Sequence, residues 1–166
     1  MPDLALAGER LIASVENARA PFTVNYTAIS TNTPGTPVTT ETAWISTPAI
    51  TFLPGRSYRL TIKGLLTPTA ASSEGRIRVH RDTVSGATLY DSFRITTPSS
   101  GANYGFEFSN LISNNGSSAV SAVLVGTVSR DSGTATYSVA SSATHVAYLH
   151  TEDFGPASDF PGATPL

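Results

Sequence analysis

The sequence predicts an all-β fold, an antiparallel jelly-roll-like β-sandwich of about eight or nine strands. From residue 22 onward, apolar and polar side chains alternate with a period of two, which is typical of half-buried strands. Turn-forming Gly, Pro, Asn and Asp residues interrupt this alternation at short intervals. No segment with helical periodicity lies between the strands, and this argues against a βαβ architecture. At 166 residues and 17.3 kDa, the chain has the size of one domain.

The first half of the chain contains several predicted strands separated by turns. The stretch Thr31–Pro37 is predicted to be a loop, because Pro34 and Pro37 lack the backbone donor that a strand ladder needs. Pro54–Gly55 predicts a turn before the clearest alternation in the sequence. The strands are expected at residues 22–27, 38–45, 50–52 and 58–63, and the second of them carries the only tryptophan, Trp44.

The second half repeats this pattern after a predicted small-residue loop at Leu65–Gly75. Tyr104, Phe106 and Phe108 share one strand face, and at this spacing we interpret them as core residues rather than as a carbohydrate-stacking stripe. Strands are expected at residues 76–81, 88–95, 104–108, 119–129, 135–140 and 146–149, with the first two paired as one antiparallel hairpin and the fourth and fifth as another.

The two ends of the chain differ from its strand-rich middle. Near the start, Leu11, Ile12 and Val15 have helical spacing within residues 8–19, and we expect them to form a docking face on a short helix that needs a surface to pack on. The end is rich in Pro and aromatic residues without periodicity. Three regions are therefore predicted: an N-terminal arm with a short helix at 1–20, a β-sandwich domain at 21–152 and an extended C-terminal tail at 153–166.

The composition excludes several classes of protein. Charged residues make up 13% of the chain, against about 25% in a typical soluble domain. Ser and Thr together occupy 44 positions, and the ten basic residues comprise nine arginines and one lysine, Lys63. The lack of cysteine excludes disulfides and thiolate metal sites. The net charge of −2 argues against a nucleic-acid partner, and without a long apolar run or a basic leader we expect neither membrane insertion nor a cleaved signal peptide.

No motif in the sequence indicates an enzyme, a cofactor site or a metal site. His145 and His150 are the nearest approach to a metal cluster, but a spacing of five places them on opposite faces of a strand, and we interpret them as ordinary hydrogen-bonding residues. No serine lies in a Gly-x-Ser-x-Gly elbow. A jelly-roll hydrolase would need two carboxylates facing across a groove, and the twelve acidic residues are scattered.

Arg76, Arg78 and His80 are predicted to share one strand face and form a small cationic strip. Such a strip could contact an anionic sugar, a phosphate or the carboxylates of a neighbouring subunit. The alternative is a solvated outer face. The use of arginine almost to the exclusion of lysine favours an interface, where the planar guanidinium can pair in two places.

Three segments of the chain resemble small virion structural proteins of tailed phages of actinobacteria. Residues 7–14 (AGERLIAS) are similar to the short opening motif of these proteins, and residues 147–156 (AYLHTEDFGP) are similar to their closing motif. Residues 53–58 (LPGRSY) match the step that begins their inner sheet. His150, Thr151 and Phe154 depart from the pattern, which leaves the subgroup open.

The resemblance implies a non-enzymatic virion component with a jelly-roll-like sandwich: a minor tail protein, head fibre or capsid decoration protein, often a homotrimer. We therefore expect a protein on the particle surface that contacts other virion proteins and itself. One alternative is a receptor-recognition domain whose loops, Thr31–Pro37 or Leu65–Gly75, bind a host glycan. Another is a cellular carbohydrate-binding sandwich module.

Overall fold

The computed structural model describes residues 21–92 and 94–166. The predicted arm at residues 1–20 and its docking face, Leu11, Ile12 and Val15, lie outside the described residues. The described part of the chain is built from strands and one short 3-10 helix, η1 (Ala157–Asp159). The strands are β1 (Phe22–Ile29), β2 (Thr33–Val38), β3 (Thr42–Ser46), β4 (Ile50–Phe52), β5 (Arg56–Pro68), β6 (Ser73–Arg81), β7 (Thr88–Asp91), β8 (Ile95–Thr97), β9 (Tyr104–Asn114), β10 (Val120–Ala122), β11 (Leu124–Ser132), β12 (Tyr137–Ala140), β13 (Ala147–Pro156) and β14 (Thr164–Pro165).

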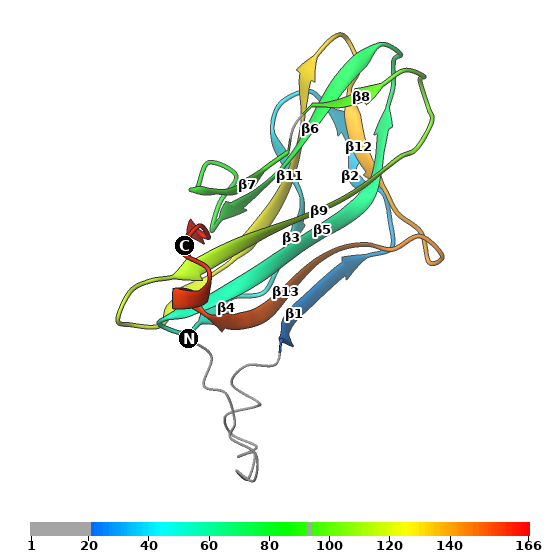
Figure 1. Cartoon of the computed structure of the whole chain (residues 1–166). Helices are drawn as coiled ribbons and strands as arrows, with labels where there is room; N and C mark the ends of the chain where they lie inside the picture. Colours follow the sequence, from blue (N-terminus) through cyan, green and yellow to red (C-terminus); the bar gives the residue numbers. More distant parts are fainter. Residues whose placement is uncertain (1–20, 93) are drawn as a thin grey trace, which may run out of the picture.

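Eight of these strands form the two sheets of a sandwich (Figure 1). The first sheet has the order β1-β13-β5-β9, and the second has the order β3-β11-β6-β7. Numbered one to eight along the chain, these strands read 1-8-3-6 in one sheet and 2-7-4-5 in the other, which is the strand order of a jelly roll. The predicted fold class is confirmed.

The long central strand β5 organises the first sheet. Its side chains alternate between buried and more exposed positions along most of its length, as the sequence predicted. One edge of β5 pairs with β13 in its first half and with β12 in its second half, whereas the other edge pairs with β9. β2 continues the sheet beyond β12, and β8 pairs with β6 beside β7 in the second sheet.

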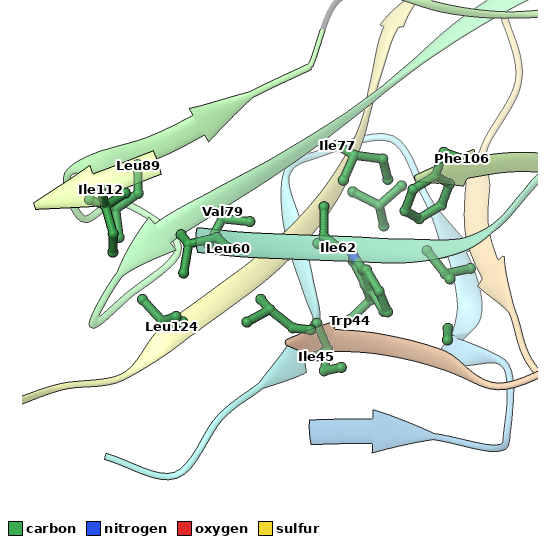
Figure 2. Packing of buried hydrophobic residues seen from close by; sticks show 14 of the residues in the cluster. Trp44, Ile45, Leu60, Ile62, Ile77, Val79, Leu89, Phe106, Ile112 and Leu124 are labelled. Carbon is green, nitrogen blue, oxygen red and sulfur yellow. The ribbon is translucent and has the colours of Figure 1, made fainter. Parts of the chain in front are cut away.

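The core lies between the two sheets, where Leu60 and Ile62 of β5 face Ile77 and Val79 of β6 (Figure 2). Trp44 is buried there and meets the ring of Phe106 edge to face, with 6.1 Å between the ring centroids. Tyr104 and Phe108 are partly buried and pack against this cluster. The interpretation of the aromatic residues of β9 as core residues is therefore confirmed.

Two predicted loops contain strand residues. Thr31–Pro37 includes most of β2. Within residues 21–92 and 94–166, β2 pairs with β12 alone and is therefore an edge strand, and prolines are tolerated where one edge of a strand faces away from the ladder. Leu65–Gly75 was also wrong as a continuous loop. β5 runs to Pro68 and β6 begins at Ser73, so four residues, 69–72, connect them.

The predicted hairpin of residues 119–129 and 135–140 is wrong. The first segment is divided at Val123: β10 pairs with β4, and β11 pairs with β3 and β6. β12 crosses to the other sheet and pairs with β5 and β2. Alternation identifies strands but carries no information on their partners, and a jelly roll places most consecutive strands in opposite sheets.

The C-terminal residues lie on the sandwich rather than extending from it. β13 continues to Pro156, beyond the predicted domain boundary at residue 152. β14 then pairs in parallel with β9, and the backbone N–H of Leu166 donates to the carbonyl of Ser113 at 2.9 Å. The sheet thus supplies the surface that this apolar segment needs.

Candidate interaction surfaces

β1 is an edge strand of the first sheet. Among the described residues it pairs with β13 alone, so its other edge carries unpaired backbone groups. The strand contains no charged residue and no proline, which are the usual protections of a sheet edge. A register shift between Thr23 and Asn25 interrupts the ladder near its start. Phe22 is 50% exposed and Tyr26 is 56% exposed.

An aromatic patch lies beside this edge on the outer face of the sheet, and we call Tyr26, Tyr148 and His150 the tyrosine patch. The rings of Tyr26 and Tyr148 have centroids 5.2 Å apart, and those of Tyr26 and His150 are 5.9 Å apart. Nε2 of His150 lies 2.9 Å from the hydroxyl of Thr23. The ammonium of Lys63 lies 5.9 Å from the ring centroid of Tyr148. An uncharged edge and an aromatic surface are therefore adjacent.

The predicted strip of Arg76, Arg78 and His80 lies on β6, on the outer side of the second sheet. Each side chain contacts a carboxylate of the same chain. Arg76 pairs with Asp91 at 2.9 Å and with Asp131 at 3.1 Å, and Arg78 pairs with Asp91 at 3.1 Å. The strip therefore supplies the basic residues of an ionic network, in which Arg76 lies between the carboxylates of Asp91 and Asp131.

Glu41 joins the other end of this network. Its carboxylate accepts hydrogen bonds from Thr127 Oγ1 at 2.7 Å and Arg78 Nη1 at 2.8 Å, and it lies 2.8 Å from Nε2 of His80. Burial raises the pKa of Glu41, but the hydrogen bonds from Thr127 and His80 and the positive charge of Arg78 outweigh it and leave the pKa below its usual range. The buried His80 ring also places Nδ1 3.1 Å from the carbonyl of Gly86, so both ring nitrogens have partners.

Two of the segments that carry the sequence resemblance meet in the structure. Within residues 53–58, the guanidinium of Arg56 binds the carboxylate of Asp153, which belongs to residues 147–156. The hydroxyl of Tyr58 accepts a hydrogen bond from the backbone N–H of Leu53 at 2.6 Å, and burial raises the pKa of this tyrosine. Sequence reasoning missed the ion pair, since the two residues are 97 positions apart.

The two predicted glycan-binding loops contribute to a common hollow. Asn32, at the beginning of the first, and Leu65 and Thr67, in the second, line a hollow of about 490 Å³ together with residues of the turn between β12 and β13. His145 lies in this turn, whereas His150 lies on β13 in the tyrosine patch. Within the described ranges there is no group of three or more His, Cys, Asp or Glu side chains that could hold a metal ion. The described residues also include no helix long and apolar enough to cross a membrane.

No family model matches the sequence, and no curated protein matches it. The structure is similar to a solved structure of the Gt strain of infectious bursal disease virus, with a TM-score of 0.48 and 13% identity over 87% of this chain and 35% of that chain. It is also similar to the VP2 subviral particle of the same virus, with a TM-score of 0.45 and 13% identity over 87% of this chain and 34% of that chain. The chain thus spans about a third of the length of these neighbours.

Proposed function

We propose that this chain is a non-enzymatic structural protein of a virus particle, located on the particle surface and acting through protein–protein contacts. The observation that carries the proposal is the edge of β1 that pairs with no strand among the described residues. This edge has no charged residue, and it exposes Phe22 and the Tyr26 ring of the tyrosine patch. In a protein that works alone, such an edge promotes uncontrolled strand pairing. In a building block, the same edge is a ready contact for a second chain.

The sequence resemblance supports the particular class. Residues 53–58 and 147–156 resemble segments of small virion proteins of actinobacterial tailed phages, and in this chain they contact each other through Arg56 and Asp153. A minor tail protein, a head fibre or a capsid decoration protein is the role that we propose within that class. The jelly-roll strand order agrees with it, because viral capsid domains commonly use this architecture.

The surface composition fits repeated contacts with neighbours. Hydroxyl side chains keep the outer strand faces polar, and they have fewer rotamers to lose on contact than lysine does. We propose that copies of the chain associate through the β1 edge, as a homotrimer. The surfaces away from the β1 edge then remain available for contacts with other particle proteins.

A charge on β1 tests this proposal. In Tyr26→Lys, an ammonium replaces an exposed ring beside the open edge, and edge charges oppose strand pairing. Asn115→Lys, in the exposed turn after β9, adds the same charge away from β1 and is the control. We expect light scattering to give a trimer for the wild type and the control and a monomer for Tyr26→Lys, which should also be lost from purified particles.

Two results would contradict the proposal. The first is the absence of the wild-type chain from purified particles of the virus that encodes it, measured by mass spectrometry. The second is equal incorporation of the Tyr26→Lys and Asn115→Lys proteins. A wild-type chain that is monomeric in solution but present in particles would overturn the trimer alone, since it would then assemble only on the shell.

A further inference from the structure

We propose that the hollow between the β12–β13 turn and the second half of β5 binds a neutral saccharide. The hollow has a volume of about 490 Å³, which lies within the usual range for small-molecule sites. Residues of the turn between β12 and β13 line it, and this turn is the orange loop in Figure 1. This inference concerns a different surface from the β1 edge and does not depend on the proposed particle role.

Strand pairing fixes the floor of the hollow. Leu65 and Thr67 belong to β5, and Ala140 at the end of β12 is the cross-strand partner of Leu65. Leu65 and Ala140 are partly exposed and supply an apolar surface. A sugar ring carries C–H groups on its faces, so a floor of this kind can contact one face of the ring.

Hydrogen bonds within the chain hold the walls. The side-chain oxygen of Asn103 accepts from the hydroxyl of Thr67 at 2.6 Å, and that of Asn32 accepts from the backbone N–H of Ser141 at 3.0 Å. Ser141 is buried, and its hydroxyl donates to the carbonyl of Ile29 at 2.5 Å and accepts from the N–H of Ala147 at 3.1 Å. The walls are thus ordered before a ligand arrives, which lowers the entropy lost on binding.

These contacts leave donors available inside the hollow. Both amide oxygens are engaged, whereas the amide nitrogens of Asn32 and Asn103 make no hydrogen bond to any described residue. Each nitrogen can donate two hydrogen bonds. Ser142 adds a hydroxyl, and His145 adds a ring whose Nδ1 contacts the hydroxyl of Thr144 at 3.2 Å. Saccharide hydroxyls can accept from the amides and donate to the hydroxyl and imidazole groups.

The charge of the lining selects the class of saccharide. None of the described residues that line the hollow is Asp, Glu, Lys or Arg. An acidic sugar would lose part of its hydration there without gaining a counter-charge, and this disfavours it relative to a neutral one. The ligand class that fits is therefore a neutral hexose or a short neutral oligosaccharide.

A second hollow extends the site along the sheet. It has a volume of about 180 Å³, shares Leu65 and His145 with the first and continues to Lys63 and Val146. The ammonium of Lys63 already pairs with the carboxylate of Glu107 at 3.5 Å, so its charge is compensated within the chain. Additional sugar units can occupy this second hollow, so we infer that an oligosaccharide binds more tightly than a monosaccharide.

The test is a glycan array carrying neutral and acidic oligosaccharides, probed with the full chain, followed by calorimetry on the neutral glycan with the highest signal. Asn103→Asp keeps the side-chain oxygen that accepts a hydrogen bond from Thr67, and it removes the amide NH₂ group that is proposed to donate to the ligand. Asn115→Asp makes the same change in an exposed turn at the far end of β9 and is the control. We expect neutral glycans to give the signal, with at least tenfold weaker binding for Asn103→Asp and unchanged binding for the control.

Three outcomes would overturn the inference: no glycan signal from folded wild-type protein, a signal from acidic glycans alone, or equal affinities for the wild type and Asn103→Asp. The melting temperature of each variant shows whether a loss of binding reflects unfolding, and Asn32→Asp provides a second donor removal in the same wall. Incorporation of Asn103→Asp into particles separates this site from the proposed particle role, because the β1 edge is unaltered in that variant.

Discussion

Arg56 and Asp153 form a bidentate ion pair that ties the beginning of β5 to the end of β13. Nε of Arg56 lies 3.1 and 3.0 Å from the two carboxylate oxygens, and Nη2 lies 2.5 Å from one of them. The Asp153 side chain is 2% exposed and that of Arg56 is 17% exposed. The same carboxylate accepts from the N–H of Gly155, whose φ of 134° is a glycine conformation.

Removing the charge of Asp153 should destabilise the fold strongly. Asp153→Asn removes the carboxylate charge from a largely buried ion pair, and breaking a buried pair in this way costs about 3 kcal/mol. Urea unfolding followed by intrinsic fluorescence measures the change. Glu107→Gln breaks the exposed pair of Lys63 and Glu107 and should change stability by less than about 1 kcal/mol. Similar effects of both substitutions would contradict the assigned role of Asp153.

Glu41 should make stability depend on pH in the acidic range. Its folded pKa lies below the usual value of 4.5, so its ionised form stabilises the fold fully above about pH 4.5. That contribution is lost as the pH falls through the folded pKa. We expect Glu41→Gln to melt at a lower temperature than the wild type at pH 7 and to lose less on acidification. The melting temperature of both proteins is measured between about pH 3 and 7. An equal fall in melting temperature for the wild type and Glu41→Gln over this range would refute the linkage.

Gly126 allows two layers of the core to approach each other. A Cβ atom at this position would lie 2.5 Å from Cγ2 of Ile45 and 3.1 Å from Cδ1 of Ile62. Gly126→Ala should therefore destabilise the protein by about 1–3 kcal/mol through overpacking. Gly105→Ala, on β9, is the control, because the nearest atom to its Cβ would be Cδ2 of Leu65 at 3.9 Å. The comparison requires chemical unfolding of the two variants, and equal stabilities would disprove close packing at Gly126.

The arm should matter for assembly. Deletion of residues 1–19, or replacement of Leu11, Ile12 and Val15 by Asp, removes the predicted docking face while leaving the sandwich sequence intact. We expect a reduced amount of the chain in purified particles or a smaller oligomer by light scattering. If both quantities are unchanged, the predicted docking face is wrong.

Local patterns in the sequence predicted the elements well, and their partners poorly. The alternation of Tyr58–Lys63 identifies the first half of β5 and that of Arg76–Arg81 identifies the last two thirds of β6, because period two reflects one buried face. The same reasoning placed Thr31–Pro37 in a loop, since whether a proline is tolerated depends on which edge of the strand is paired. Which edge of β2 is paired is determined by β12, which lies far from β2 in the sequence.

The candidate surfaces show the same division. Arg76, Arg78 and His80 lie on one strand as the spacing predicted, but their partners Glu41, Asp91 and Asp131 come from other segments. In the sequence the basic residues are close together and their acidic partners are scattered. Sequence reasoning therefore overestimates the net positive charge of the strip. The hollow is a similar case, because its walls come from segments far apart in the chain.

Phe22, Asp153, Tyr58, Ile112 and Thr164 are successive partners in one row across the first sheet. The entry of the chain into the sandwich and the parallel strand β14 are therefore at one end of the molecule, about 20 Å apart at the usual strand spacing. The hollow lies near Leu65 and Thr67, seven to nine residues further along β5 than Tyr58, or about 23–30 Å away. If the domain were attached through the start of β1 or through β14, that end of the sandwich would face the attachment point. The end that carries the hollow would then face away from it.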